Sequence, residues 1–137
     1  MEFPPHDCGG GIAVPEPLLN QSYRGSVYDY KTTAQAYMRR RHPGHTGFRT
    51  VMPSWDNTAR RQDAADVFVG ATPGAYQAWL QWMIGETRKH NFGEERIVFI
   101  NAWNEWAEAN YLEPDVRWGH AYLEATMKAL QAVDREP

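Results

Sequence analysis

Residues 97–115 constrain the fold of this chain more than any other stretch, because a short apolar run there changes abruptly into polar and aromatic residues. The run at residues 97–100, Ile-Val-Phe-Ile, predicts a strand that is buried on both of its faces. The segment after it carries two glutamates three positions apart, Glu105 and Glu108, among tryptophans and amides. This composition at a strand end is unusual for a purely structural loop and indicates a site.

Length and composition limit the class of protein. The 137 residues suffice for one domain with a core, and 42% hydrophobic and 23% charged content is ordinary for a globular protein. The net charge of −3 gives no reason to expect a nucleic-acid partner. No apolar run approaches the roughly 20 residues that cross a bilayer, and the start lacks the pattern of a signal peptide. Cys8, the only cysteine, excludes an intrachain disulfide, so we expect a cytoplasmic chain without a membrane span.

The predicted elements alternate in the order helix, strand, helix, strand, helix. The glycines and prolines of residues 1–29 predict mostly irregular structure there. Such alternation implies parallel strands with right-handed crossovers, and in that architecture sites lie where strands end. Apolar spacing places the helices and strands at residues 30–41, 48–52, 73–89, 97–100 and 119–134.

A second polar and aromatic segment, residues 53–61, follows the first predicted strand. One interpretation is a capped loop in which Asp56 and Asn57 satisfy backbone donors. The other is a substrate loop in which Trp55 stacks on a sugar and Asp56 or Arg60 makes charged hydrogen bonds. The residues leave both interpretations open.

The paired glutamates suit the chemistry of glycosidic bonds. Glycoside cleavage typically uses two carboxyl groups that flank the bond, and Glu105 and Glu108 supply such a pair. If their loop forms about one helical turn, side chains three positions apart project to the same side. A capping pair on an exposed turn is the structural alternative. Glu113 is a further candidate for binding substrate hydroxyls, whereas Asp115 can equally cap the last helix.

Three blocks of this sequence resemble one family. The residues Asn-Ala-Trp-Asn-Glu-Trp-Ala-Glu at 101–108, with Leu-Glu-Pro-Asp at 112–115, resemble the signature of the WbsX-type glycosyltransferase-like proteins. These proteins are related to glycoside hydrolase family 99, the endo-α-mannosidases. Residues 51–61 resemble a second block and residues 2–6 a shorter third one. The blocks occur in the order of the family and span nearly the whole chain.

The resemblance implies a (β/α)8 barrel, a TIM barrel, with its active site at the carboxyl ends of the strands. It implies Glu105 as the base that deprotonates the 2-hydroxyl of the sugar, and Glu108 as the general acid and later the base. The substrate is then an oligosaccharide or glycan, and no metal and no organic cofactor is implied. The residues that we expect to bind this substrate are Trp55, Asp56, Asn57, Arg60, Trp103, Asn104, Trp106 and Glu113.

The chain departs from the family pattern at two alanines. The hydrolases usually carry His and Gly where this chain has Ala107 and Ala109, so the resemblance does not extend to endo-mannosidase specificity. The WbsX-type relatives share the first alanine but usually have Gly at the second position. If that glycine has a positive φ, Ala109 strains the loop by about 1 kcal/mol.

A complete eight-fold barrel needs roughly 200 residues or more. We therefore expect residues 1–137 to form one partial domain, the C-terminal portion of a barrel with two to three parallel strands and flanking helices. Its uncovered sheet edge would allow association with another chain. The expected function is a carbohydrate-active enzyme segment that acts on glycosidic bonds in bacterial surface polysaccharide (O-antigen-like) metabolism. Hydrolysis and transfer stay open, and the alternative is a noncatalytic sugar-binding or inactive truncated fragment.

Overall fold

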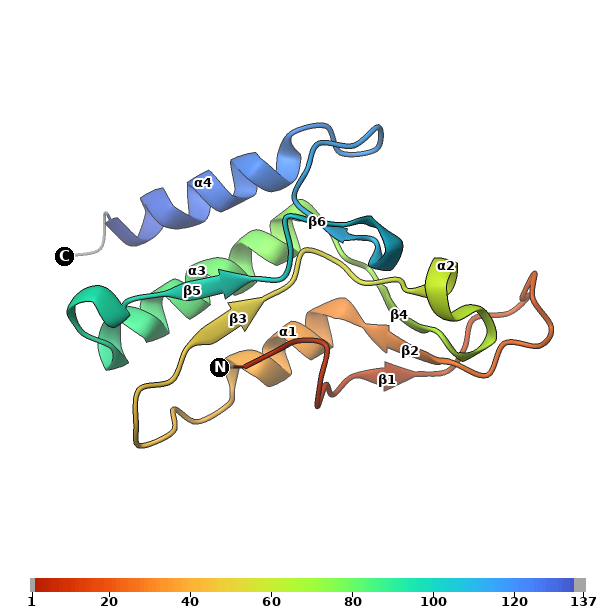
Figure 1. Cartoon of the computed structure of the whole chain (residues 1–137), viewed down its shortest axis with the longest axis horizontal. Helices are drawn as coiled ribbons and strands as arrows, with labels where there is room; N and C mark the ends of the chain where they lie inside the picture. Colours follow the sequence, from red (N-terminus) through yellow and green to blue (C-terminus); the bar gives the residue numbers. More distant parts are fainter. Residues whose placement is uncertain (1, 135–137) are drawn as a thin grey trace.

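The computed structural model describes residues 2–134 and shows a mixed α/β fold (Figure 1). Among the described residues, short strands form two parallel pairs, and four α-helices connect or cover them. In chain order the helices and strands are β1 (Gly11–Ile12), β2 (Ser26–Asp29), α1 (Tyr30–Met38), β3 (Arg49–Val51), α2 (Thr58–Arg61), η1 (Gln62–Ala64), β4 (Asp66–Val69), α3 (Pro73–His90), η2 (Gly93–Glu95), β5 (Val98–Ile100), β6 (Asn104–Glu105), η3 (Trp106–Glu108), β7 (Asn110–Tyr111) and α4 (Ala121–Asp134).

The strands pair across long stretches of sequence. β3 and β5 run parallel with Thr50 opposite Phe99, which confirms that the two strands predicted from the sequence are parallel neighbours. β2 and β4 form a second parallel pair, with Val27 opposite Val67, that the sequence did not reveal. β1 adds to β2 in the antiparallel sense, and β6 with β7 forms a short antiparallel ladder.

The N-terminal residues lie beside β3. The amide of Glu2 donates to the Phe48 carbonyl at 3.0 Å, and the Thr50 hydroxyl donates to the Glu2 carbonyl at 2.6 Å. The Asn101 side chain then donates to the Pro4 carbonyl at 3.0 Å. Residues 2–4 therefore lie alongside β3, while β5 lies on the other side of that strand.

β5 is an edge strand, so the prediction that residues 97–100 are buried on both faces is wrong. Ile97 is 41% exposed and Phe99 is 42% exposed. Among the described strands β5 pairs with β3 alone, which leaves its other edge and part of its surface uncovered. An apolar run indicates that a strand can be buried, but the neighbours that would bury it here are absent from the described residues.

The long helices follow their sequence signals closely. Asp29 caps α1 by accepting a bond from the Thr32 amide, and Thr72 caps α3 ahead of Pro73. The predicted final helix begins two residues late, at Ala121, because Gly119 has a φ of +53° that no α-helix contains.

The core lies between these helices and the sheets. α3 packs behind β3 and β5, and α4 lies along α3 (Figure 1). Trp79 of α3 is fully buried and contacts the rings of Tyr30 and Tyr37 at centroid distances of 5.8 and 5.4 Å. This aromatic interior fixes the helices, and the polar loops extend beyond the strands that the helices support.

Candidate functional site

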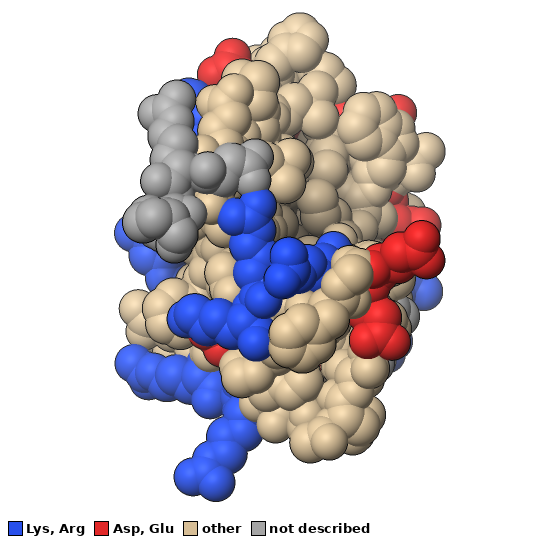
Figure 2. Space-filling view, turned by 90° about the vertical axis from the view of Figure 1, so that its left-hand side faces the viewer, with Lys and Arg blue, Asp and Glu red and all other residues tan. Residues whose placement is uncertain are grey.

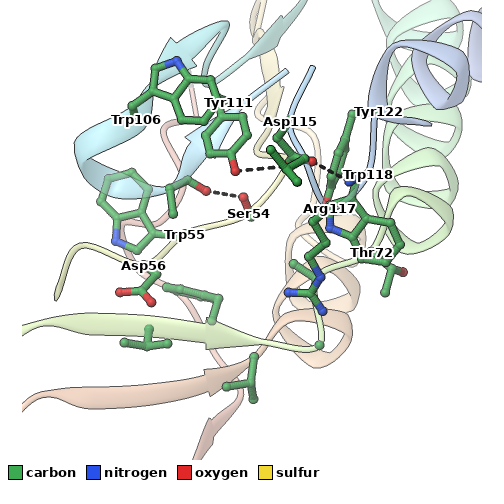
Figure 3. Close-up of a pocket in the computed structure, with 17 residues that line it drawn as sticks. Ser54, Trp55, Asp56, Thr72, Trp106, Tyr111, Asp115, Arg117, Trp118 and Tyr122 are labelled. Atoms are coloured by element: carbon green, nitrogen blue, oxygen red, sulfur yellow. Dashed lines mark hydrogen bonds between the residues drawn. The ribbon is translucent and has the colours of Figure 1, made fainter. Parts of the chain in front are cut away.

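A pocket of about 700 Å³ lies between the loops that follow β3 and β4 and the segment that precedes α4. Figure 3 shows Trp55 and Asp56 on one side of it, and Arg117, Trp118 and Tyr122 on the other. Its lining is formed by Ser54, Trp55, Asp56, Val67, Phe68, Val69, Gly70, Ala71, Thr72, Trp106, Ala109, Tyr111, Asp115, Val116, Arg117, Trp118 and Tyr122.

The loop after β3 is held in place mainly by its own backbone. The carbonyl of Trp55 accepts a hydrogen bond from the Phe68 amide at 2.8 Å, so this loop pairs with β4. The indole of Trp55 is only 8% exposed, and its ring both joins the core and lines the pocket. One carboxylate oxygen of Asp56 accepts from the Thr58 amide at 2.9 Å. Asp56 thus satisfies a backbone donor at the start of α2, as the capped-loop interpretation predicts, and it also lines the pocket.

The two segments that the sequence singled out lie against each other. The Asp56 amide donates to the Glu108 carbonyl at 2.8 Å, and the Asn101 amide donates to the Val51 carbonyl at 2.9 Å. The Ser54 hydroxyl donates to the carbonyl of Ala109. These bonds make residues 51–56 and 101–109 one continuous structure at the carboxyl end of the β3–β5 sheet.

Aromatic side chains with bonded polar groups form one wall of the pocket. The rings of Trp106 and Tyr111 stack at 3.8 Å between centroids, and the Trp106 indole donates to Glu113 at 2.6 Å. The Tyr111 hydroxyl donates to one oxygen of Asp115 at 3.0 Å. The other oxygen of Asp115 accepts from the Trp118 amide at 2.5 Å. Asp115 therefore stabilises the turn before α4 and orients Tyr111 across the pocket.

Burial keeps the pocket's tyrosines protonated. Burial raises the pKa of Tyr111, and its hydrogen bond to Asp115 raises that pKa further. Burial likewise raises the pKa of Tyr122 to about 12. Both phenols are therefore neutral over the physiological range. The single O–H of Tyr111 is donated to Asp115, so its oxygen can only accept a bond from a ligand hydroxyl, whereas the Tyr122 hydroxyl can donate to one.

Ala109 adopts the left-handed conformation, with φ 45° and ψ 35°. This is the position at which the WbsX-type relatives usually carry glycine, and the structure confirms that its φ is positive. An alanine in this region costs about 1 kcal/mol relative to glycine because its Cβ approaches the following carbonyl. The strain lies between Glu108 and the short strand β7, where the chain turns back towards the pocket.

The structure distributes the predicted site residues over several surfaces. Trp55, Asp56 and Trp106 line the pocket, whereas Glu105 and Glu108 lie outside its described lining. Glu105 is exposed in β6, so it is not buried among tryptophans as its neighbours in the sequence suggested. Glu108 makes an ion pair with Arg60 of α2, and its side chain is 14% exposed.

The remaining predicted residues either form hydrogen bonds within the protein or lie outside the pocket lining. Asn57 is buried, and its side-chain oxygen accepts from the Asp66 amide at 2.8 Å. Glu113 bonds to the Trp106 indole rather than lining the pocket itself. Trp103 is 53% exposed and Asn104 is also exposed, both outside the pocket lining.

The pocket also contains polar and aromatic residues that the sequence did not single out as site residues. Ser54 and Tyr111 lie inside the two polar and aromatic segments but were not chosen as candidates, whereas Thr72 was interpreted as a helix cap and the other three residues lie outside those segments. Arg117, whose guanidinium lies 5.0 Å from the centroid of the Trp118 ring, is the most informative of them because it brings a cation to the pocket. The residues missed in this way are Ser54, Thr72, Tyr111, Arg117, Trp118 and Tyr122.

Two absences within residues 2–134 bear on ligands and membranes. Within this range no group of three or more His, Cys, Asp and Glu side chains is arranged to hold a metal ion. No helix in the same range is both long enough and apolar enough to cross a membrane.

Comparison with known proteins identifies relatives over most of the chain. Two proteins named WxcX, from two strains of Xanthomonas campestris pv. campestris, are each 37% identical to it over 131 residues. The match covers 95% of this chain but only 19% of each relative, so the chain spans about a fifth of their length. No solved structure matches the chain. The family described as "Glycosyltransferase WbsX" matches residues 11–126, and this chain therefore belongs to that family.

Proposed function

We propose that this chain is part of a carbohydrate-active enzyme that acts on glycosidic bonds in bacterial surface polysaccharide metabolism. The observation that carries the proposal is the pocket, in which Trp55, Trp106 and Trp118 accompany Asp56 and Asp115. Indole faces can cover the C–H face of a sugar ring, while carboxylates accept bonds from its hydroxyls. Membership of a glycosyltransferase-like family supports a glycan as the ligand.

The same proposal assigns the chain to the C-terminal portion of a (β/α)8 barrel. The parallel pair β3–β5, with α3 packed against both strands, is the arrangement that such a barrel repeats. The unpaired edge of β5 leaves a place for a neighbouring strand, and the relatives are long enough to supply one. A structure of a full-length WxcX protein in which no strand pairs at this edge would contradict the assignment.

We assign catalysis to Glu105 as the base and Glu108 as the acid. Glu108 belongs to the segment that is bonded to the pocket loop through Asp56, and its neighbour Ala109 lines the pocket. Glu108 is paired with Arg60, so the acid role requires that substrate binding separate this ion pair. Since no metal or cofactor is part of this scheme, all proton transfer falls to the two carboxyl groups.

The test compares turnover and binding in the same samples. Purified chain is incubated with bacterial surface polysaccharides, and cleavage or transfer is measured by new reducing ends and by mass spectrometry. Glu105→Gln and Glu108→Gln should each lower turnover by at least about 100-fold, as expected for loss of general acid–base catalysis. Glu94→Gln, the same change at an exposed residue of η2, is the matched control and should leave turnover unchanged. Wild-type turnover that persists in both site variants would remove the two glutamates from the mechanism.

A second candidate function is sugar binding without turnover by this chain. It is favoured by the exposure of Glu105 and by the pairing of Glu108 with Arg60 outside the pocket lining. Under this hypothesis no variant shows turnover, while Trp106→Ala weakens the affinity for a glycan measured by calorimetry. Turnover by the wild type that is lost in the glutamine variants would exclude this alternative.

A further inference from the structure

The end of the molecule at the amino ends of β3 and β5, away from the pocket, carries an exposed basic surface. It is built from the end of α1, the end of α3 and the turn that leads into β5. We call it the basic end face and define it by residues 39–42, 82, 88–92 and 96. Figure 2 views the molecule from this side and shows lysine and arginine side chains gathered across it, with acidic side chains mainly at its margins.

Specific contacts hold the two helix ends together. The rings of His42 and His90 stack at 4.4 Å between centroids, and His42 lies 3.4 Å from the side-chain oxygen of Asn91. The indole of Trp82 donates to the Met38 carbonyl at 3.3 Å, which joins α3 to the last turn of α1. The arginine run that follows α1 is therefore fixed beside the basic C-terminal turn of α3.

The charges on this end differ from those of the rest of the chain. Residues 39–45 and 86–96 contain six Lys and Arg and three Glu, a net charge of +3 before any histidine is counted. The whole chain has a net charge of −3, so the remaining residues carry −6. Glu86 also directs its carboxylate to Lys89 and His90 of its own helix, at 2.9 and 3.6 Å. The end face thus presents positive charge on an otherwise acidic chain.

Individual cations of this face are available to a partner to different degrees. Arg39 and Arg41 are exposed, whereas Arg40 lies over the ring of Tyr37 at 3.8 Å and donates to the Asp7 carbonyl. Arg40 is therefore a structural residue. Arg39 and Arg41 can be changed with little effect on the core.

Exposed aromatic rings lie among these cations. Phe92 is 71% exposed and is placed between Lys89 and Arg96 in the sequence, and Trp82 is 49% exposed. A large apolar ring in water is unfavourable, but at the headgroup level of a bilayer such rings are stabilised next to lysine and arginine. This second feature favours a lipid surface over an inorganic polyanion such as polyphosphate, which has no apolar group for these rings to contact.

We propose that the basic end face binds the surface of an anionic membrane. The cations contact lipid phosphates, and Phe92 and Trp82 enter the interfacial layer, as in other peripheral proteins that combine basic and aromatic residues. The occupied face lies at the opposite ends of the strands from the pocket, so membrane binding leaves the pocket accessible. The inference does not depend on the chemistry proposed for that pocket.

Vesicle cosedimentation tests this proposal. The chain should sediment with vesicles of phosphatidylcholine mixed with phosphatidylglycerol and stay in solution with phosphatidylcholine alone. Arg39→Gln/Arg41→Gln should lower the partition coefficient roughly 25-fold, because each cation near an anionic surface contributes about fivefold. Phe92→Ser should also weaken binding to the anionic vesicles. The tryptophan fluorescence of the wild type should shift to the blue on binding, and this shift should be smaller in Trp82→Phe.

A matched control removes two arginines from elsewhere on the surface. Arg24→Gln/Arg61→Gln, at exposed positions before β2 and at the end of α2, should bind the vesicles as the wild type does. Circular dichroism and melting curves establish that each variant is folded. Equal sedimentation with neutral vesicles, equal loss in the control, or no binding at low salt would overturn the proposal. So would a stronger affinity for an oligonucleotide, or full release by millimolar glycerol phosphate.

Discussion

The buried aromatic residues of the helices and the exposed Trp106 beside the pocket belong to two different environments. Tyr30, Tyr76 and Trp79 are fully buried, and the two phenols are bonded to Met52 and Thr126. Trp106, in contrast, is 50% exposed beside the pocket. The interior rings lie on helices at regular spacing, while Trp106 follows a strand in irregular sequence. High aromatic content alone therefore does not indicate a site; the position of each ring relative to its element does.

The largest effect expected from this comparison is on stability. Trp79→Ala should lower the free energy of unfolding by about 3–5 kcal/mol, because it leaves a cavity among Tyr30 and Tyr37. Trp82→Ala on the same helix is the matched control, since its ring is 49% exposed. Urea titration measures both variants. Equal losses would show that the two positions do not differ as described.

The interior phenols make the fold sensitive to alkali. Burial raises the pKa of Tyr37 and of Tyr122 to about 12, against about 10 for an unfolded tyrosine. The pKa of each phenol is higher in the folded chain than in the unfolded chain. The stabilisation that this difference provides is therefore complete below pH 10 and disappears as the pH rises through 12. The free energy of unfolding should fall over that window. Tyr37→Phe and Tyr122→Phe should each make the fall less steep, and an unchanged slope would contradict this assignment.

For the exposed Trp106 beside the pocket, we predict a loss of binding with little loss of stability. Trp106→Ala should weaken glycan affinity roughly tenfold, as for other truncated aromatic contacts, and barely change the unfolding curve. Trp103→Ala is the control, because that indole is 53% exposed and lies outside the pocket lining. Calorimetric titration measures both affinities. If both variants bind like the wild type, the pocket is not the sugar site.

The smallest predicted effect has the opposite sign. Ala109→Gly should raise the free energy of unfolding by about 1 kcal/mol, because Ala109 is held at a positive φ. Ala107→Gly is the control two residues earlier in the 3-10 turn, and it should not stabilise the chain. Thermal melting distinguishes the two variants. A destabilised Ala109→Gly variant would mean that the methyl group of Ala109 contributes more through packing than its backbone conformation costs.

Much of the framework follows from the sequence because its signals are local. Thr72 with Pro73 begins α3, Asp29 begins α1, and the apolar run at residues 97–100 marks the strand that pairs with β3. Sequence resemblance also identified the family correctly. Each of these rests on residues close together in the chain or on a short motif, which a single sequence can reveal.

The features that were missed depend on distant partners. β2 and β4 are short, and only their pairing across about 40 residues makes them strands. Whether an apolar strand is buried depends on its neighbours, and among the described strands β5 pairs with β3 alone, so its apolar composition was misleading. At the site, spacing suggested that Glu105 and Glu108 lie together among tryptophans. Arg60, which comes from another element, engages Glu108 instead.

The main-chain bond between Asp56 and Glu108 has a consequence for how this family can diversify. Because amide and carbonyl groups make the junction, it tolerates replacement of the side chains at either position. The exposed side chains of the two loops can therefore be replaced independently, while the positions of the loops relative to each other are retained. A library of variants randomised at these exposed side chains would then sample many ligand specificities on one unchanged backbone.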